Sequence, residues 1–173
     1  MVTAPRLETE RLILRGFEPS DYENVHEIFS DEDWSQFIGG PLSRGNSWRA
    51  FASLVGHWSI RGYGTFAVDE KSTGQFVGMI GHWFPEEWPE PEIGWTLSKS
   101  AAGKGYATEA VNAVLDHTFN TLKWETAISL IAPANEASKK VANRVGAVFE
   151  KEITCRDNLV GVYRHPNPNK TVN

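Results

Sequence analysis

Residues 92–122 constrain the fold of this chain more than any other segment. An extended stretch (92–97) is followed by Gly103-Lys104-Gly105 and then by a long run of helical periodicity. In that run, apolar residues recur at the three- to four-residue spacing of one helix face, at Ala107, Ala110, Val111, Val114 and Leu115. A helix with one apolar face must bury it, and the strand before it supplies a sheet to pack against. The segment therefore predicts a helix packed on a sheet.

Hydrophobic patterning along the rest of the chain predicts an α+β protein. Alternating residues or short apolar runs predict strands, at 11–17, 65–68, 75–84, 92–97, 126–131, 147–154 and 158–164. Helical spacing predicts helices, at 21–29, 47–60, 103–122 and 135–145. This order predicts one mainly antiparallel sheet of about seven strands, flanked by about four helices. Two glycines inside the strand 75–84, Gly78 and Gly81, indicate bulges or a close approach to another backbone.

The composition favours a single domain. The chain has 173 residues, of which 40% are hydrophobic and 23% charged, so a packed core is expected. We expect residues 1–165 to form the domain and residues 166–173 a flexible tail. The net charge of −5 disfavours a nucleic-acid partner. The single cysteine, Cys155, excludes an internal disulfide framework and a cysteine-rich metal site.

The chain has no sequence feature that predicts membrane attachment. No apolar run approaches the roughly 18 residues that a membrane helix requires, and the first residues contain no apolar leader core. We therefore expect a cytoplasmic protein without a membrane partner.

The Gly103-Lys104-Gly105 turn is a candidate phosphate site. Glycines let main-chain N–H groups converge on one point, and the N-terminus of the following helix adds a positive field. The alternative is a simple helix-entry turn. Tyr106 and Ala107 follow, so this is not a Walker loop, and Thr108 occupies the third glycine position of a dinucleotide-binding fingerprint.

At these residues the sequence resembles a known family. Residues 94–97, a five-residue gap and residues 103–110 resemble the acetyl-CoA motif of the GCN5-related N-acetyltransferases (GNAT), in their RimJ/RimL-like branch of ribosomal-protein N-terminal acetyltransferases. The segments 7–15, 78–81, 135–138 and 146–149 resemble further motifs of that branch. One departure is Ala102, where the family motif has Gln or Arg, and another is Gly146-Ala147 in place of the commoner Gly-Phe.

The resemblance implies a fold, a cosubstrate and a binding site. It implies a sheet splayed between its fourth and fifth strands, and acetyl-CoA as acetyl donor without a metal. The cofactor-binding residues that it implies are Ala102, Gly103, Lys104, Gly105, Tyr106, Ala107, Thr108, Asn135 and Ser138. It also implies that the main-chain N–H of Leu97 stabilises the developing oxyanion. The reaction would be direct attack of a primary amine on the thioester, in a ternary complex.

Two residues are candidates for the general base. Glu92 begins the fourth predicted strand, where the family commonly has a carboxylate, and burial beside Trp95 would raise its pKa toward neutrality. The alternative is a solvated carboxylate at a strand end. His82 has a suitable intrinsic pKa, but a hydrogen-bonded histidine among aromatic side chains is the favoured explanation.

Two hydroxyls are candidates for the acid that protonates the leaving sulfur. Asn135-x-x-Ser138 resembles a family motif near the cofactor's sulfur, although Asn135 is also a favoured helix N-cap with Ser138 in the first turn. Tyr163 lies in the last predicted strand, where another branch of the family has a tyrosine acid.

The segment before Glu92 indicates a cationic acceptor. Glu86, Glu87 and Glu90 lie within seven residues of one another and of Glu92, and Trp83 or Trp88 could add a cation–π contact. The alternative is a solvated acidic turn. The family branch favours a protein or peptide α-amine, while the loop also suits a small polyamine or amino sugar.

Other functions remain open at this stage. The departure at Ala102 allows a non-catalytic acyl-CoA-binding or regulatory domain, and the glycine turn alone allows an unrelated phosphate-binding module. Either a monomer or a homodimer is compatible with the sequence.

Overall fold

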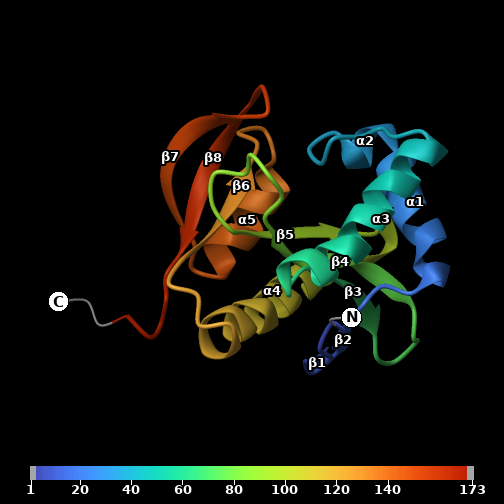
Figure 1. The fold of residues 1–173 in the computed structure, drawn as a ribbon, viewed down its shortest axis with the longest axis horizontal. Coiled ribbons are helices and arrows are strands. Elements are labelled where there is room, and N and C mark those ends of the chain that lie inside the picture. Colours follow the sequence, from blue (N-terminus) through green and yellow to red (C-terminus); the bar gives the residue numbers. More distant parts are fainter. Residues whose placement is uncertain (1–2, 171–173) are drawn as a thin grey trace.

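The computed structural model describes residues 3–170 and contains one eight-stranded sheet (Figure 1). The strands are β1 (Leu7–Glu8), β2 (Leu12–Arg15), β3 (Thr65–Glu70), β4 (Phe76–Trp83), β5 (Glu92–Leu97), β6 (Ala127–Ile131), β7 (Val148–Cys155) and β8 (Asn158–His165). Their order across the sheet is β1-β2-β3-β4-β5-β6-β8-β7. Every neighbouring pair is antiparallel except β5 and β6, which are parallel.

The helices divide between the two faces of the sheet. They are α1 (Tyr22–Ser30), α2 (Glu32–Ser35), α3 (Arg44–Arg61), α4 (Tyr106–Asp116) and α5 (Glu136–Arg144). Adjacent residues of β4 show the division, because Met79 packs with side chains of α1 and α3 whereas Ile80 packs with side chains of α4. Helix α5 follows β6 and packs beside it, away from α1–α3 (Figure 1).

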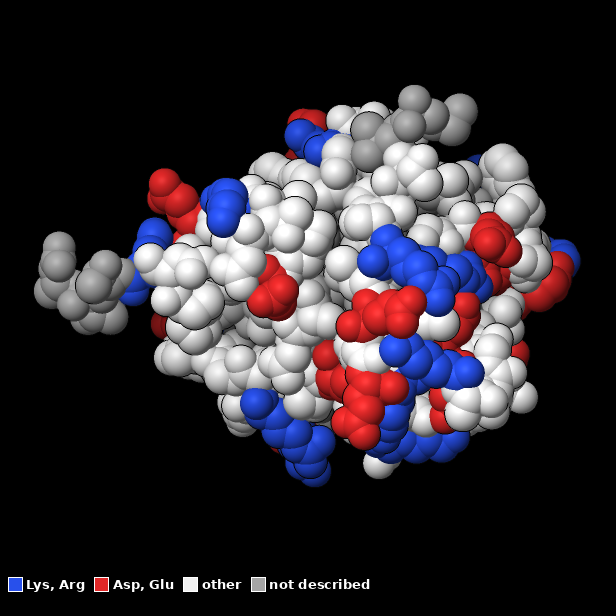
Figure 2. All heavy atoms as spheres, turned by 90° about the horizontal axis from the view of Figure 1, so that it is seen from below, with Lys and Arg blue, Asp and Glu red and all other residues white. Residues whose placement is uncertain are grey.

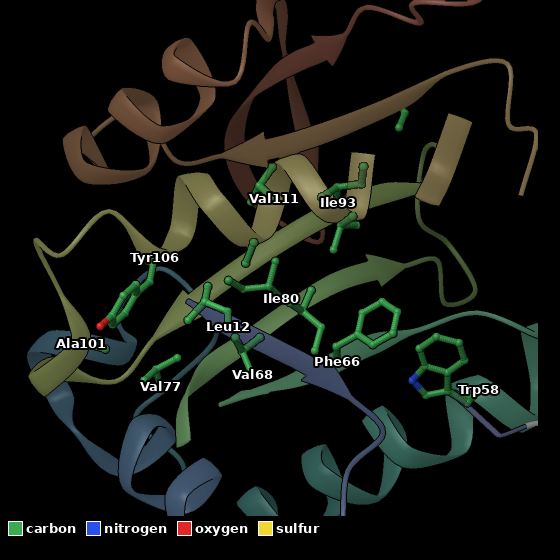
Figure 3. Packing of buried hydrophobic residues seen from close by; sticks show 14 of the residues in the cluster. Leu12, Trp58, Phe66, Val68, Val77, Ile80, Ile93, Ala101, Tyr106 and Val111 are labelled. Carbon is green, nitrogen blue, oxygen red and sulfur yellow. The ribbon is translucent and has the colours of Figure 1, made fainter. Parts of the chain in front are cut away.

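The larger core cluster joins the sheet to α4. Figure 3 shows Phe66 and Val68 of β3, Ile80 of β4 and Val111 of α4 directed into one apolar layer. All four side chains are fully buried, and each stabilises the fold by about 1.5–3 kcal/mol relative to an exposed position. The periodicity of the 103–122 segment thus predicted the face of α4 that the core covers.

The predicted α+β class and mainly antiparallel sheet are confirmed, with two additional elements. Strand β1 has two residues, too few for a visible alternation, and it pairs with β2. Helix α2 has four residues, and its N-cap Asp31 accepts a hydrogen bond from the Trp34 amide at 2.8 Å. The predicted helix 103–122 is shorter in its α-helical part, because its last residues form a π-helical turn, His117–Thr121.

The segment after β8 contacts the domain in its described part, 166–170. The Asn167 side-chain amide donates to the carbonyl of Trp124 at 3.0 Å, and that of Asn169 donates to Asn120 Oδ1 at 3.0 Å. These contacts were not expected from the sequence. The rest of the predicted tail, 171–173, lies outside the described residues.

Charged side chains of both signs share the face that carries β1 and β2. Figure 2 shows basic and acidic atoms side by side over one half of the view from below. The ion pairs of these strands include Arg6–Glu8 at 2.9 Å and Lys71–Glu8 at 3.0 Å. Within residues 3–170, no helix has the length and apolar character needed to cross a membrane.

Candidate active site

The sheet opens between β5 and β6. These strands pair only at Glu92 and Ile128, whereas β6 remains paired with β8 from Ala127 to Ile131. From Gly94 onward, β5 therefore has a partner on its β4 side alone. This confirms the predicted splay between the fourth and fifth predicted strands, which are β5 and β6.

Side chains join the two strands where they begin to separate. One main-chain bond remains, from the Ile128 amide to the Pro91 carbonyl at 3.2 Å. Next to it, Ser129 Oγ donates to the Ile93 carbonyl at 2.6 Å, and the Leu130 amide donates to Glu92 Oε1 at 3.1 Å. The carboxylate of Glu92 thus replaces the backbone acceptor that a continuous sheet would offer to Leu130.

Leu97, at the other end of β5, directs its main-chain groups into this opening. The Ser98 amide donates to the Val77 carbonyl toward β4 at 2.9 Å. Successive N–H groups of a strand point to opposite sides, so the Leu97 N–H faces the opening. The Leu97 carbonyl faces the same way and accepts a hydrogen bond from Trp34 Nε1 at 2.6 Å.

The turn before α4 offers main-chain donors. Gly103 and Gly105 have φ values of +77° and +81°, which residues with a Cβ rarely adopt. No side chain caps α4, and its first intrahelical bond is from the Glu109 amide to the Gly105 carbonyl at 3.2 Å. The amides of residues 106–108 precede that bond and have no partner within the helix. Such a set of amides suits a pyrophosphate.

The Tyr106 side chain points from this turn into the core, and the Arg11 guanidinium lies over its ring at 4.6 Å from the centroid. The Tyr106 hydroxyl donates to Glu70. Ala107 is buried as well, whereas residues 102–105 are exposed. The orphaned indole N–H of Trp95, which packs against clusters on both sides of the opening, is a further buried donor without a partner within residues 3–170.

Arg11, which sequence reasoning missed, lies between β1 and β2 and supports the turn through hydrogen bonds. Its Nε donates to Glu109 Oε2 at 2.7 Å and its Nη1 donates to the Lys104 carbonyl at 3.0 Å. Glu109 also accepts from Thr9 Oγ1 at 2.6 Å. Burial raises the pKa of Glu109, but these hydrogen bonds outweigh it and leave the pKa below its usual value. The resemblance of residues 7–15 marked this segment without indicating its contact.

Glu92 has the electrostatic environment of a group that titrates near neutrality. Its Oε2 accepts a hydrogen bond from Trp88 Nε1 at 2.6 Å, and its Oε1 accepts from the Leu130 amide. Burial raises the pKa of Glu92 to about 7, while the two hydrogen bonds act in the opposite sense. Two hydrogen bonds and partial burial distinguish Glu92 from a carboxylate that is freely solvated at a strand end.

Comparison with known sequences decides the family. Residues 11–148 match the family described as the acetyltransferase (GNAT) domain. The chain is a GNAT protein.

Individual relatives agree with this membership. YkkB of Bacillus subtilis (strain 168), an uncharacterized protein, is 31% identical over 95% of this chain and 97% of its own. The crystal structure of an acetyltransferase from Agrobacterium tumefaciens str. C58 is 32% identical, covers 96% of each chain and has a TM-score of 0.87. The ribosomal-protein-S5-alanine acetyltransferase of Vibrio fischeri shares the fold, with 20% identity over 95% of this chain and 98% of its own and a TM-score of 0.73.

Membership in the GNAT family makes this chain an acyltransferase with acetyl-CoA as cosubstrate. The amides at the start of α4 and the orphaned Trp95 N–H fit such a ligand. Among residues 3–170, no group of three or more His, Cys, Asp or Glu side chains is arranged to hold a metal ion.

His82 lies in the core of this GNAT domain. It is fully buried, and its Nε2 forms a hydrogen bond with Thr118 Oγ1 at 2.7 Å. Burial, with a smaller contribution from His117, lowers the pKa of His82 to about 3. Its ring packs edge-on against Trp124, with 4.9 Å between centroids. His82 is therefore a hydrogen-bonded histidine among aromatic side chains. Its imidazole is buried between β4 and the π-helical turn, where an amine in the β5–β6 opening would not reach it.

Ser138 lies in the first turn of α5, and Tyr163 lies in β8. Asn135 Oδ1 accepts a hydrogen bond from the Ser138 amide at 3.1 Å, which confirms the predicted N-cap of α5. Tyr163 pairs with Ser129 of β6 and packs in one cluster with Ala142 of α5. Within the described residues, neither hydroxyl forms a hydrogen bond, so both retain a proton to donate.

The acidic loop 85–91 is less negative than its sequence indicates. Glu86 forms an ion pair with Arg61 at 2.7 Å, and Glu90 forms one with Arg164 at 2.9 Å. Glu87 forms no ion pair within residues 3–170, and Glu92 is held at the β5–β6 opening. The indole of Trp83 stacks on His57, with 4.9 Å between centroids. Tertiary ion pairs therefore neutralise two of the four carboxylates.

Proposed function

We propose that this protein transfers the acetyl group of acetyl-CoA to a primary amine by direct attack, with Glu92 as general base. The observation that carries the proposal is the carboxylate of Glu92 at the apex of the β5–β6 opening, with its pKa raised to about 7. An amine arrives as an ammonium ion at neutral pH, and a base with this pKa can remove its proton. A domain that only binds acyl-CoA has no need of such a group.

The remaining steps use groups around the same opening. The amine nitrogen forms a bond to the acetyl carbon as the thioester C–S bond breaks. The Leu97 N–H donates to the carbonyl oxygen as negative charge develops on it. Ser138 or Tyr163 supplies the proton to the departing sulfur. Tyr163 pairs with Ser129 of β6, the strand to which Glu92 is bonded, and Ser138 lies in the first turn of α5, the helix that follows that strand.

Residues 102–108 hold the pyrophosphate through main-chain amides in this proposal. Because the contact does not depend on the side chain of Ala102, the departure from the family motif weakens binding without abolishing it. Asn135 already uses its Oδ1 for the α5 cap, so its side-chain NH₂ is the group left to contact the cofactor.

The acceptor is a cationic primary amine in this proposal, either a protein or peptide α-amine or a small polyamine or amino sugar. Glu87 carries the electrostatic part, since Glu86 and Glu90 are already paired with arginines. The fold shared with a ribosomal-protein acetyltransferase supports the α-amine as one class to test.

A thiol-release assay tests the proposed function. Acetyl-CoA is incubated with the protein and a panel of peptides, polyamines and amino-sugar antibiotics. We expect thiol release with at least one amine and one acetyl group gained by that amine in mass spectrometry. Tight binding of acetyl-CoA in calorimetry without turnover of any amine would favour the binding-only alternative. Preference for ATP or NAD over acetyl-CoA would contradict both.

A further inference from the structure

Trp88 contacts the proposed general base directly. The residue lies in the loop between β4 and β5, and its indole N–H donates to Glu92 Oε2 at 2.6 Å. We infer that Trp88 is a positioning residue, whose indole N–H holds the Glu92 carboxylate at the apex of the β5–β6 opening and stabilises its ionised form. The inference rests on the proposed role of Glu92 as base.

The two oxygens of Glu92 are held by two different elements. Trp88 of the loop bonds one oxygen, and the Leu130 amide of β6 bonds the other at 3.1 Å. A carboxylate oxygen accepts two hydrogen bonds, so one acceptor position on each oxygen remains for an incoming amine. Because each oxygen has its own donor, rotation of the carboxylate would break at least one bond.

The loop is built to direct Trp88 at this carboxylate. Glu87, directly before it, has a φ of +67°, which is uncommon for a residue with a side chain. The Trp88 amide closes a turn onto the Pro85 carbonyl at 3.3 Å. Ion pairs fix the loop on both sides of the indole, through Glu86 to Arg61 and through Glu90 to Arg164. Carboxylates that the sequence assigned to acceptor capture thus anchor the loop.

Two neutral donors favour the ionised form of Glu92 and lower its pKa, the Leu130 amide more and the Trp88 indole less. Within residues 3–170, Glu92 forms no ion pair, and Arg164 of β8 is already bound to Glu90 and Glu150. The charge of Glu92 also acts on Cys155 of β7. Burial raises the pKa of the Cys155 thiol most, and the Glu92 charge raises it further. A cation beside Glu92 would make it too weak a base, whereas a neutral N–H donor lowers its pKa by a smaller amount.

The variant Trp88→Phe tests the inference, because it keeps an apolar ring and removes the N–H donor. We expect the acidic limb of the kcat/KM profile to move to higher pH by roughly 0.5–2 pH units. Activity should fall at pH 6–7 and recover near pH 9, with acetyl-CoA affinity unchanged. A purely structural role would lower activity equally at every pH, and that outcome would overturn the inference.

Two controls separate this inference from the proposed function. Trp48→Phe, at an exposed position on α3, should leave the profile unchanged. In the Glu92→Gln background, Trp88→Phe should have no further effect on the profile. If Glu92→Gln retains the acidic limb, the proposed base is wrong. If Glu92→Gln removes the limb while Trp88→Phe does not move it, only the role of Trp88 is wrong.

A measurement on the parent protein covers the case in which Trp88→Phe does not fold. The indole ¹H–¹⁵N resonance of Trp88 should titrate with the same midpoint as the Glu92 carboxyl carbon, and should not titrate in Glu92→Gln. Independent midpoints would overturn the inference.

Discussion

The pyrophosphate turn and the apex around Glu92 are built in opposite ways. The turn consists of consecutive residues, 103–108, and offers main-chain amides whose direction follows from two positive φ values. The apex collects Glu92 from β5, Leu130 from β6 and Trp88 from a loop, and its chemistry depends on side chains and burial. A main-chain site can therefore be found in a short sequence motif, whereas a carboxylate with a shifted pKa depends on the fold around it.

The pyrophosphate turn is not built from consecutive residues alone, because Arg11 also contacts it. It joins the turn to β1 and β2 through Glu109 and the Lys104 carbonyl. Even the local site therefore depends in part on a segment almost a hundred residues earlier.

The largest effect is expected at the apex. Glu92→Gln should lower kcat by about 10²–10⁴-fold, the usual contribution of a general base, and leave acetyl-CoA affinity nearly unchanged. Turnover is measured by thiol release and affinity by calorimetry. If the variant turns over like the parent, the general base is another residue, and the region around Glu92 has no catalytic role.

The burial of Glu92 should also appear in stability. Its pKa is about 7 in the folded protein against a usual value of 4.5, so the folded state favours the protonated form. The resulting stabilisation is complete below pH 4.5 and is lost as pH rises through 7. Relative to Glu92→Gln, the parent should lose on the order of 2–3 kcal/mol of unfolding free energy between pH 4.5 and 8 in urea titrations.

Two histidines titrate in the opposite sense and serve as an internal control. Burial lowers the pKa of His82 to about 3 and that of His165 to about 4. Their stabilisation is present above pH 6.5 and lost as pH falls. It affects parent and Glu92→Gln equally, so it cancels in the difference. A difference that does not vary with pH would show that Glu92 is solvated.

The turn should respond to a change of backbone preference. Gly105→Val places a β-branched residue at a φ of +81°, which such residues rarely adopt. The new Cβ would lie 3.5 Å from Arg11 Nη2, an ordinary van der Waals contact. The dissociation constant for acetyl-CoA should rise at least about tenfold, or 1.4 kcal/mol, with the fold intact. Gly62→Val, at a φ of +78° after α3, is the matched control. Equal affinities for Gly105→Val and the parent in calorimetry would show that acetyl-CoA does not bind at this turn.

Arg11→Ala tests whether the turn is local. It removes the bonds to Glu109 and to the Lys104 carbonyl, and leaves the two glycines in place. Acetyl-CoA affinity should fall by less than the tenfold expected for Gly105→Val, as measured by calorimetry. A loss of affinity larger than that of Gly105→Val would show that the Arg11 contacts, more than the glycine backbone, determine acetyl-CoA binding.

The smallest effect concerns the acidic loop. Glu86→Lys together with Glu87→Lys should raise KM for a cationic acceptor more at low than at high salt, because salt screens exposed charges. Glu87→Lys alone should account for most of the change, since Glu86 is already paired with Arg61. Equal KM values for parent and double variant at low ionic strength would leave the loop only its structural role.

The sequence by itself determined the elements that depend on neighbouring residues. The period of the apolar residues after Gly105 located α4 and its buried face, strand β5 was predicted at its observed bounds, and Asn135 was recognised as a helix cap. Each of these follows from dihedral preferences or side-chain spacing within a few residues.

The hydrogen-bond and ion-pair partners of the charged groups come mostly from residues far away in the sequence. Glu92 meets Leu130 38 positions later, Glu90 meets Arg164 74 positions later, and the Arg11 amide meets Glu109 across 98 positions. His82 is buried because β4 lies beneath the turn that carries Thr118. Burial and hydrogen-bond partners set a pKa. The residues beside Glu92 in the sequence predicted a raised pKa, and Trp88 lies only four positions away. The Leu130 amide, which holds the other carboxylate oxygen, comes from a strand distant in the chain, and no local pattern indicated it.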